Sequence, residues 1–132
     1  MDLHYEWRAP FANADLNALH AEGFRHRPVD VDWRRQVERH SLGWVCAYDE
    51  GRLVGFVNVA WDGRVHAFVV DTVVAHGARR RGVGTRLLEL AARESRSAGC
   101  EWLHVDFGED LRDFYFGSCG FASTPAGVMA FR

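Results

Sequence analysis

Apolar and polar residues alternate through much of the first half of the chain, and this alternation predicts β-strands. A first strand is expected at residues 3–8, and three further strands at residues 44–48, 53–61 and 65–74. The last three are separated by short polar segments, and Asp62 followed by Gly63 is a strong hairpin signal. We therefore expect an antiparallel meander in this part of the chain.

Helical spacing of apolar residues predicts four helices around these strands. They are expected from Asn13 or Asp15 to residue 22, and over residues 30–40, 83–98 and 110–118. Further strands are expected at residues 101–107 and 126–131. A strand–helix–strand crossover thus follows the meander, which predicts a mixed α/β fold with helices packed on a twisted, mostly antiparallel sheet. No repeat or linker interrupts this order, so residues 1–132 are expected to form one domain.

Residues 73–88 are the most informative segment, because a β-branched strand leads there into a turn rich in arginine and glycine and then into a helix. Small residues at such a turn leave backbone N–H groups exposed at the positive end of the helix, where phosphate commonly binds. Arg79, Arg80 and Arg81 add positive charge to this turn. The plainer alternative is a connection whose arginines are only solvated, and it fits less well because helix N-termini normally avoid so much positive charge. A phosphorylated ligand is therefore the first hypothesis.

The glycine spacing of this turn, Arg79-x-x-Gly82-x-Gly84, excludes two common phosphate-binding motifs. A P-loop requires a lysine and then a serine or threonine after G-x-x-x-x-G. A dinucleotide-binding fingerprint requires a third glycine, and Leu87 stands at that position. The turn also follows a meander instead of the first strand of the chain.

The element order, the strand end Val73-Val74, the R-x-x-G-x-G turn and the later Cys119-Gly120-Phe121 resemble the GCN5-related N-acetyltransferase (GNAT) family over almost the whole chain. The resemblance implies the GNAT fold and acetyl-coenzyme A (acetyl-CoA) as co-substrate. It implies that the pyrophosphate is bound by backbone N–H groups of the turn. The residues of this turn are Arg79, Arg80, Arg81, Gly82, Val83, Gly84 and Thr85. It also implies that the pantetheine arm pairs with the end of the preceding strand, at Val73, Val74 and Ala75.

Asp71 is the candidate general base. Transfer of an acetyl group to an amine requires a deprotonated amine, and a free alkylamine has a pKa of about 10.4. A carboxylate acting directly or through a water molecule can take this proton, and Asp71 is the only acidic residue in the apolar run 67–75. It lies just before the residues that the resemblance assigns to the cofactor, where the family often carries an acidic residue. The alternative is a half-exposed strand aspartate paired with an arginine across the sheet.

Tyr115 is the candidate general acid, since the family often uses a tyrosine to protonate the departing coenzyme A thiolate. Counting back from Gly120 without a gap puts the family's tyrosine position at Phe116 instead. Helical phase favours Tyr115, because it shares a face with Phe114 while Phe116 points away. An insertion of one residue before Cys119 would reconcile the two assignments. The alternative role for Tyr115 is aromatic packing in the core.

Composition narrows the partners and the location. The chain has 132 residues and a formal net charge of -2, whereas a nucleic-acid-binding domain would usually be basic, so no nucleic-acid partner is expected. No apolar run is long enough to cross a membrane, and the N-terminus lacks the apolar core of a secretory signal, so a cytoplasmic location is expected. Three cysteines and the histidines lack metal-ligand spacing, which predicts neither a disulfide framework nor a metal site.

The acceptor is the least determined part of the sequence-based hypothesis. The resemblance implies that the acceptor groove is built from residues 24–43, and their mixed charge indicates no clear preference. The short chain favours a compact acceptor, such as a small-molecule amine or a peptide terminus. Two other functions stay open at this stage, acetylation of lysines on a partner protein and non-catalytic binding of acyl-CoA. The acyl chain length and the oligomeric state also stay open, a homodimer included.

Overall fold

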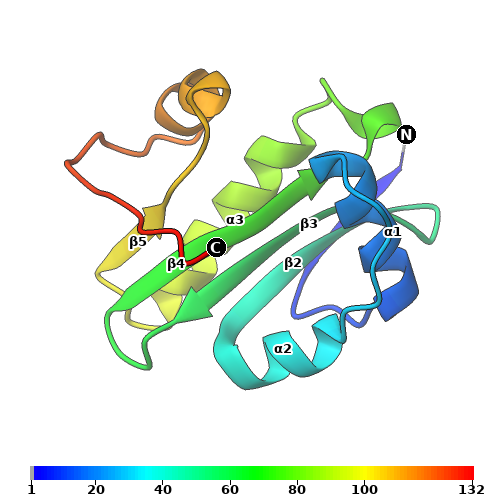
Figure 1. Cartoon of the computed structure of the whole chain (residues 1–132), viewed down its shortest axis with the longest axis horizontal. Coiled ribbons are helices and arrows are strands. Elements are labelled where there is room, and N and C mark those ends of the chain that lie inside the picture. Colours follow the sequence, from blue (N-terminus) through cyan, green and yellow to red (C-terminus); the bar gives the residue numbers. More distant parts are fainter. Residues whose placement is uncertain (1) are drawn as a thin grey trace.

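The computed structural model describes residues 2–132 and has a five-stranded sheet at its centre (Figure 1). The strands are β1 (Leu3–Trp7), β2 (Ser41–Asp49), β3 (Arg52–Trp61), β4 (His66–Val74) and β5 (Trp102–Val105). Each strand pairs with the next one in the sequence, antiparallel except for β4 and β5, which run parallel. The predicted meander, the crossover between β4 and β5 and the mixed α/β fold are therefore confirmed.

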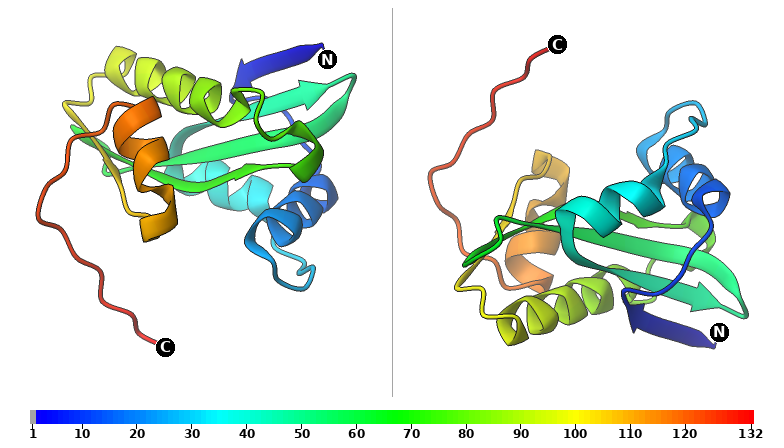
Figure 2. Two further views of the ribbon diagram at one scale, coloured as in Figure 1. Left: turned by 90° about the horizontal axis from the view of Figure 1, so that it is seen from above. Right: turned by 90° about the horizontal axis from the view of Figure 1, so that it is seen from below.

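Helices cover both faces of the sheet, as Figure 2 shows. On one face lie α1 (Asn13–Phe24) and α2 (Trp33–His40), and on the other lies α3 (Val83–Ser97). The shorter elements are two 3₁₀ turns, His76–Ala78 and Glu109–Leu111, and a π-helix, Asp113–Ser118. The second 3₁₀ turn and the π-helix occupy the region where the sequence predicts one short helix.

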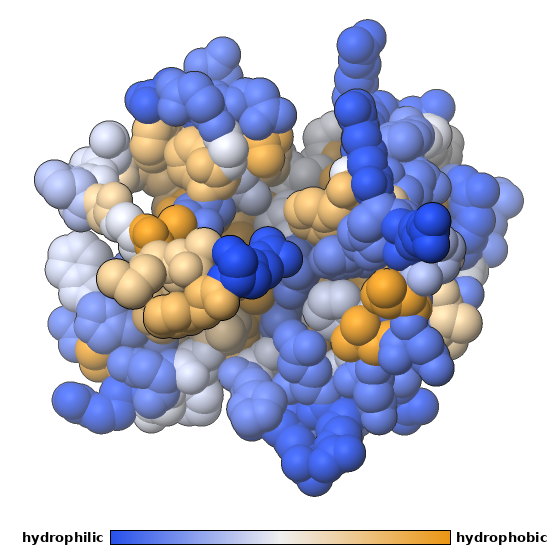
Figure 3. Space-filling view, viewed as in Figure 1, coloured by the Kyte–Doolittle hydropathy of each residue, from blue (hydrophilic) through white to orange (hydrophobic). Residues whose placement is uncertain are grey.

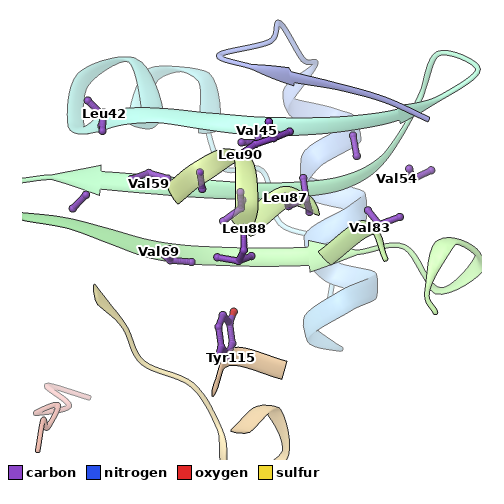
Figure 4. Packing of buried hydrophobic residues seen from close by; sticks show 14 of the residues in the cluster. Leu42, Val45, Val54, Val59, Val69, Val83, Leu87, Leu88, Leu90 and Tyr115 are labelled. Carbon is purple, nitrogen blue, oxygen red and sulfur yellow. The ribbon is translucent and has the colours of Figure 1, made fainter. Parts of the chain in front are cut away.

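The apolar stripe of α3 is buried against the sheet (Figure 4). Leu87 is completely buried, and Val83 and Leu88 are nearly so. They belong to one cluster with Val54 and Val59 of β3, which are also completely buried. Because burial of one such side chain contributes about 1.5–3 kcal/mol, this packing holds the first turn of α3 beside the end of β4.

The opposite face of the sheet is covered by α1 and α2. Val37 of α2 and Leu16 of α1 are completely buried and belong to one cluster with Phe56 of β3. The indole Nε1 of Trp33 donates a hydrogen bond to Asn17 Oδ1 at 3.0 Å, which links the two helices directly. This link ties α1 to α2 on this face of the sheet.

Helix ends differ from the predicted ones by a few residues, for local reasons. The helix expected over residues 30–40 begins at Trp33, because the Asp32 carboxylate accepts a hydrogen bond from the backbone N–H of Arg35 and caps the helix there. At the other helix, α3 ends at Ser97, and Gly99 adopts the left-handed conformation with φ 96°.

The strand expected at residues 126–131 is absent, so this prediction is wrong. Residues 119–132 form no strand, and the segment after Phe121 leads away from the sheet (Figure 2). Val128 and Phe131 are 80% and 93% exposed. A strand requires a hydrogen-bonded neighbour, and the apolar residues of this segment do not reach one, so the sequence pattern alone is insufficient here.

The surface of the molecule is largely hydrophilic in the view of Figure 3. Smaller apolar areas lie between the hydrophilic residues. Within residues 2–132, no helix is both long enough and apolar enough to traverse a membrane.

Candidate active site

The parallel strands β4 and β5 separate halfway along β4. Their pairing begins at His66 opposite Trp102 and ends at Val69 opposite Val105. On its other side, β4 stays paired with β3 as far as Val74. The backbone of β4 from residue 70 to residue 74 therefore has polar groups on one edge that no strand satisfies, and this edge is open to a ligand.

A β-bulge occurs in β4 at the point of separation. Two steps along β3, from Phe56 to Asn58, correspond to three along β4, from Val73 to Val70, so β4 holds one extra residue. Asp71 lies within the bulge and has φ 57°, a left-handed conformation that a short polar side chain tolerates better than a β-branched one. The bulge turns the Asp71 carboxylate away from the regular strand alternation.

The partner of Asp71 is a histidine of α1. His20 Nε2 lies 3.1 Å from Asp71 Oδ1, and the two side chains are 18% and 25% exposed. The alternative prediction was that Asp71 pairs with an arginine across the sheet. Asp71 instead pairs with His20, which lies 51 residues earlier in the chain. The His20 ring also packs against two aromatic rings. The ring centroids of Phe24 and Trp33 lie 4.4 and 5.1 Å from that of His20.

The N-terminus of α3 is an uncapped helix end. Gly82 precedes the helix with φ 75°, and no side chain caps it. The first intrahelical bond is donated by the Arg86 N–H to the Gly82 carbonyl at 3.0 Å, so the N–H groups of residues 83–85 have no intrahelical acceptor. A Cβ at Gly84 would lie 3.1 Å from the Phe114 ring, so glycine there permits the close approach of the π-helix.

A cavity of about 800 Å³ joins the open edge of β4 to this helix end. Of the residues that the sequence assigns to the cofactor, it is lined by Val73, Val74, Arg79, Arg80, Gly82, Val83, Gly84 and Thr85. Arg81 lies in the same turn but outside the lining. Ala75 lines a separate cavity of about 700 Å³ on the α1 side, and its N–H donates to the Val54 carbonyl within the sheet. The predicted cofactor residues thus gather around one cavity, with these two exceptions.

Tyr115 also lines this cavity and is only 5% exposed. Its ring stacks on Phe107 with centroids 4.8 Å apart. Burial raises the pKa of the Tyr115 phenol above its usual value of 10.0. The hydroxyl therefore stays protonated at neutral pH and is able to donate.

Phe116 lies outside the cavity lining. Its ring packs edge-on against Phe107, with centroids 5.2 Å apart, and the Arg112 guanidinium lies 5.4 Å from its centre. The π-helix accounts for the one-residue discrepancy in the sequence count, because a π-helical turn contains one residue more than an α-helical turn. Its wide turn is closed by the Cys119 N–H, which donates to the Phe114 carbonyl at 2.9 Å.

Sequence reasoning missed several contributors to the cavity, Thr72 and the last turn of α1 among them. Thr72 lines it with a buried Oγ1 that has no hydrogen-bond partner among residues 2–132, and a hydroxyl within an otherwise valine-rich run was the available signal. The last turn of α1 also contributes, through Gly23, Phe24 and the adjacent Arg25. No local signal indicates that α1 packs there, because its position depends on tertiary contacts.

Other candidate chemical groups take different positions. His66 and His104 lie on neighbouring strands with Nδ1 and Nε2 2.7 Å apart. Burial raises the pKa of the Cys119 thiol to about 11, so it is protonated at neutral pH and is a poor nucleophile. Three cysteines are free, and no group of three acidic, histidine or cysteine side chains within residues 2–132 is arranged to hold a metal ion.

Comparison with known proteins identifies the class. A sequence model of the acetyltransferase (GNAT) family matches residues 3–121. The open β4–β5 pair and the cavity at the start of α3 therefore lie in a protein with the fold of the GNAT acetyltransferases. Because the match spans most of the sequence, the chain belongs to the GNAT acetyltransferase family. No curated protein sequence matches it significantly.

Solved structures share the fold at low sequence identity. A probable acetyltransferase from meticillin-resistant Staphylococcus aureus is 19% identical, with 98% of this chain and 99% of that chain covered and a TM-score of 0.79. A Trypanosoma brucei acetyltransferase is 22% identical, with 98% and 99% covered and a TM-score of 0.78. AAC(6')-Iy in complex with the bisubstrate analogue CoA-S-monomethyl-acetylneamine is 16% identical, with 100% and 99% covered and a TM-score of 0.79.

Proposed function

We propose that this protein transfers an acetyl group from acetyl-CoA to a primary amine of a small molecule or a peptide by direct attack. One observation carries the proposal: the unpaired edge of β4, the uncapped N-terminus of α3 and the Tyr115 side chain border a single cavity of about 800 Å³. A long ligand with a polar, anionic part at one end and a reactive carbonyl at the other suits that arrangement. A location in the cytoplasm and action as one domain over residues 1–132 belong to the same proposal.

The residues present fit acetyl-CoA on the grounds of their chemistry. Free backbone N–H groups of residues 83–85 and the guanidinium groups of Arg79 and Arg80 would hold its pyrophosphate. The open edge at Val73 and Val74 would pair with the amide groups of the pantetheine arm, and the unpartnered Thr72 hydroxyl offers one further hydrogen bond. When bound, acetyl-CoA supplies an activated thioester carbonyl. Arg79 Nε now lies 3.4 Å from the Val74 carbonyl, so that contact would be exchanged for the ligand.

Two side chains carry the proposed proton transfers. Asp71, next to the cavity residue Thr72, would take the proton from the attacking amine, either directly or through a water molecule. Tyr115 would donate its phenolic proton to the departing thiolate, which its raised pKa permits because the hydroxyl is protonated at neutral pH. Backbone N–H groups on the open edge of β4 are suited to stabilise the developing oxyanion.

The acceptor is proposed to be compact. The relative AAC(6')-Iy binds a bisubstrate analogue that joins coenzyme A to acetylneamine, and this supports an amine acceptor for the present chain. Acetylation of lysines on a partner protein and non-catalytic binding of acyl-CoA are the competing functions. Release of the coenzyme A thiol, monitored with free amines and separately with a folded protein as acceptor, separates all three.

Calorimetric titration with acetyl-CoA tests the cofactor site. Gly82→Val places a β-branched residue at φ 75°, which costs about 1–3 kcal/mol and disturbs the first turn of α3. We expect acetyl-CoA affinity to fall at least about tenfold. Gly63→Val is the matched control. Gly63 lies in the β3–β4 turn with φ 86° and equally open surroundings. The Gly63→Val variant should bind acetyl-CoA with the affinity of the wild type.

The outcomes of this titration separate the site from the function. A wild-type protein that does not bind acetyl-CoA would overturn the proposed function. Full binding by Gly82→Val would overturn the assignment of the α3 N-terminus. Binding with no turnover on any amine would leave the protein as an acyl-CoA-binding module.

A further inference from the structure

Asp71 is the inner end of a chain of hydrogen-bonded groups that reaches the protein surface. Its Oδ1 lies 3.1 Å from His20 Nε2, and His20 Nδ1 lies 2.7 Å from His26 Nε2. The chain ends where His26 Nδ1 lies 2.6 Å from the backbone carbonyl of Arg27. His26 is exposed, whereas His20 is only partly so, which gives the chain one sheltered end and one end in water.

Counting hydrogens determines the protonation of this cluster. A backbone carbonyl only accepts, so the contact with Arg27 requires a hydrogen on His26 Nδ1. In the neutral imidazole His26 Nε2 is then an acceptor, and His20 must carry its hydrogen on Nδ1. His20 Nε2 is left without a hydrogen and faces a carboxylate oxygen. Three contacts need three hydrogens, and two neutral imidazoles supply only two.

We propose that Asp71, His20 and His26 form a proton relay that takes up one proton as the acceptor amine is deprotonated. This inference rests on the proposed function of Asp71 as the base. His20 and His26 act through Asp71 and are positioning residues. Without the third hydrogen, His20 Nε2 and Asp71 Oδ1 oppose their lone pairs at 3.1 Å, so one added proton satisfies both atoms.

The proton transfer balances without any further reactant. The N–H bond of the substrate ammonium breaks, the nitrogen keeps the electron pair, and the proton passes to the Asp71 carboxylate and on to His20 Nε2. The nitrogen then uses that pair to form its bond to the acetyl carbonyl carbon, and the thioester C–S bond breaks with its electron pair on sulfur. The thiolate takes the phenolic proton of Tyr115, and the second proton lost by the new amide nitrogen replaces it on Tyr115. One proton returns to water from the exposed His26.

The groups that face His20 are two titratable side chains and two uncharged aromatic rings. From β4 it faces Asp71, and from the segment after α1 it faces His26. The flanking rings are Phe24 on α1 and Trp33 on α2, and neither carries a charge. The imidazole pair His66 and His104, with a contact of the same 2.7 Å length on β4 and β5, provides an internal comparison that has no such chain to Asp71.

Nitrogen NMR of ¹⁵N-histidine-labelled full-length protein tests the relay without requiring turnover. At basic pH we expect His20 and His26 both to carry hydrogen on Nδ1 alone, and at acidic pH we expect His20 to gain one on Nε2. In Asp71→Asn the amide donates to His20 Nε2, so the gain on His20 should be lost while the signals of His66 and His104 stay unchanged. A His20 hydrogen on Nε2 at basic pH, or unchanged His20 signals in Asp71→Asn, overturns the relay.

Kinetics of two His20 variants separate proton transfer from simple orientation of Asp71. In His20→Gln the amide N–H still reaches Asp71 but cannot accept a proton, and His20→Ala removes both contributions. We expect kcat to fall at least about tenfold in both variants with acetyl-CoA affinity unchanged. Restoration of wild-type kcat by glutamine would overturn proton transfer through His20. Absence of turnover in the wild type would overturn the proposed function instead, and the NMR result would still decide whether the relay exists.

Discussion

At the α3 end of the cavity, six lining residues come from the single stretch Arg79–Thr85, whereas the Tyr115 end is assembled from β4, α1 and the π-helix. The first end works through backbone groups: an uncapped helix start and a glycine in the left-handed conformation. The second end works through side chains whose positions depend on tertiary packing. The comparison teaches that the proposed binding part of this site is encoded locally and the proposed chemical part is not.

The largest expected effect tests whether the two ends are separable. In Asp71→Asn the side-chain size and the tolerance for φ 57° are kept, but the base is lost. We expect kcat to fall by a factor of about 100 or more, with the acetyl-CoA affinity within about twofold of wild type by calorimetry. Asp49→Asn, a similarly half-buried strand aspartate at the far end of β2, is the control and should retain wild-type kcat. Parallel loss of affinity and kcat in Asp71→Asn would contradict the separation.

Tyr115→Phe should have a smaller effect, because a thiolate is a fairly good leaving group without a general acid. The ring keeps its stacking on Phe107, and we expect kcat to fall about tenfold. Since burial raises the pKa of Tyr115 above 10.0, its contribution should persist through neutral pH and be lost only as the pH rises above 10. Tyr5→Phe, on β1, is the control. Unchanged kcat in Tyr115→Phe would assign Tyr115 to packing alone.

The smallest expected effect concerns Thr72, a residue of β4 that lines the cavity. Thr72→Val removes a buried hydroxyl without a partner and keeps the side-chain shape, so the free energy of unfolding of the ligand-free protein should rise by about 1 kcal/mol in urea denaturation. If the hydroxyl binds acetyl-CoA, affinity should fall about fivefold. Thr124→Val, in the exposed C-terminal segment, should change neither quantity. A variant with higher stability and undiminished affinity would show that the hydroxyl has no role in binding.

The sequence predicted the strands, their meander order and the turn at Gly82, and it missed specific contacts between residues distant in the chain. The strand, turn and helix around Gly82 follow from β-branched residues, a left-handed glycine and apolar helical spacing, and all three are present. The pairing of Asp71 with His20 joins positions 51 residues apart, and no spacing rule reports such a contact. Helical phase favoured Tyr115 as the candidate, but the π-helix that explains the residue count is not visible in the pattern of apolar positions.

At residues 126–131 the sequence pattern predicts an element that the structure lacks. The apolar residues of this segment have the composition of a strand, yet strand formation depends on a neighbour, and these side chains remain exposed. Local pattern is therefore a sound guide where hydrogen bonds are made within the segment, as in α3. It is a less certain guide where they must be made with another part of the chain, since the five strands of the sheet form as predicted but the strand at 126–131 does not.

The close approach of α1 to β4 restricts how this sequence can diverge. A Cβ at Gly23 would lie 2.1 Å from Cγ2 of Val73, so even alanine at position 23 would force the valine at position 73 to shift. Val73 lines the cavity from β4, and Gly23 lines it from the last turn of α1. Evolution can therefore enlarge one of these positions most easily by shrinking the other, so the two should covary among related sequences.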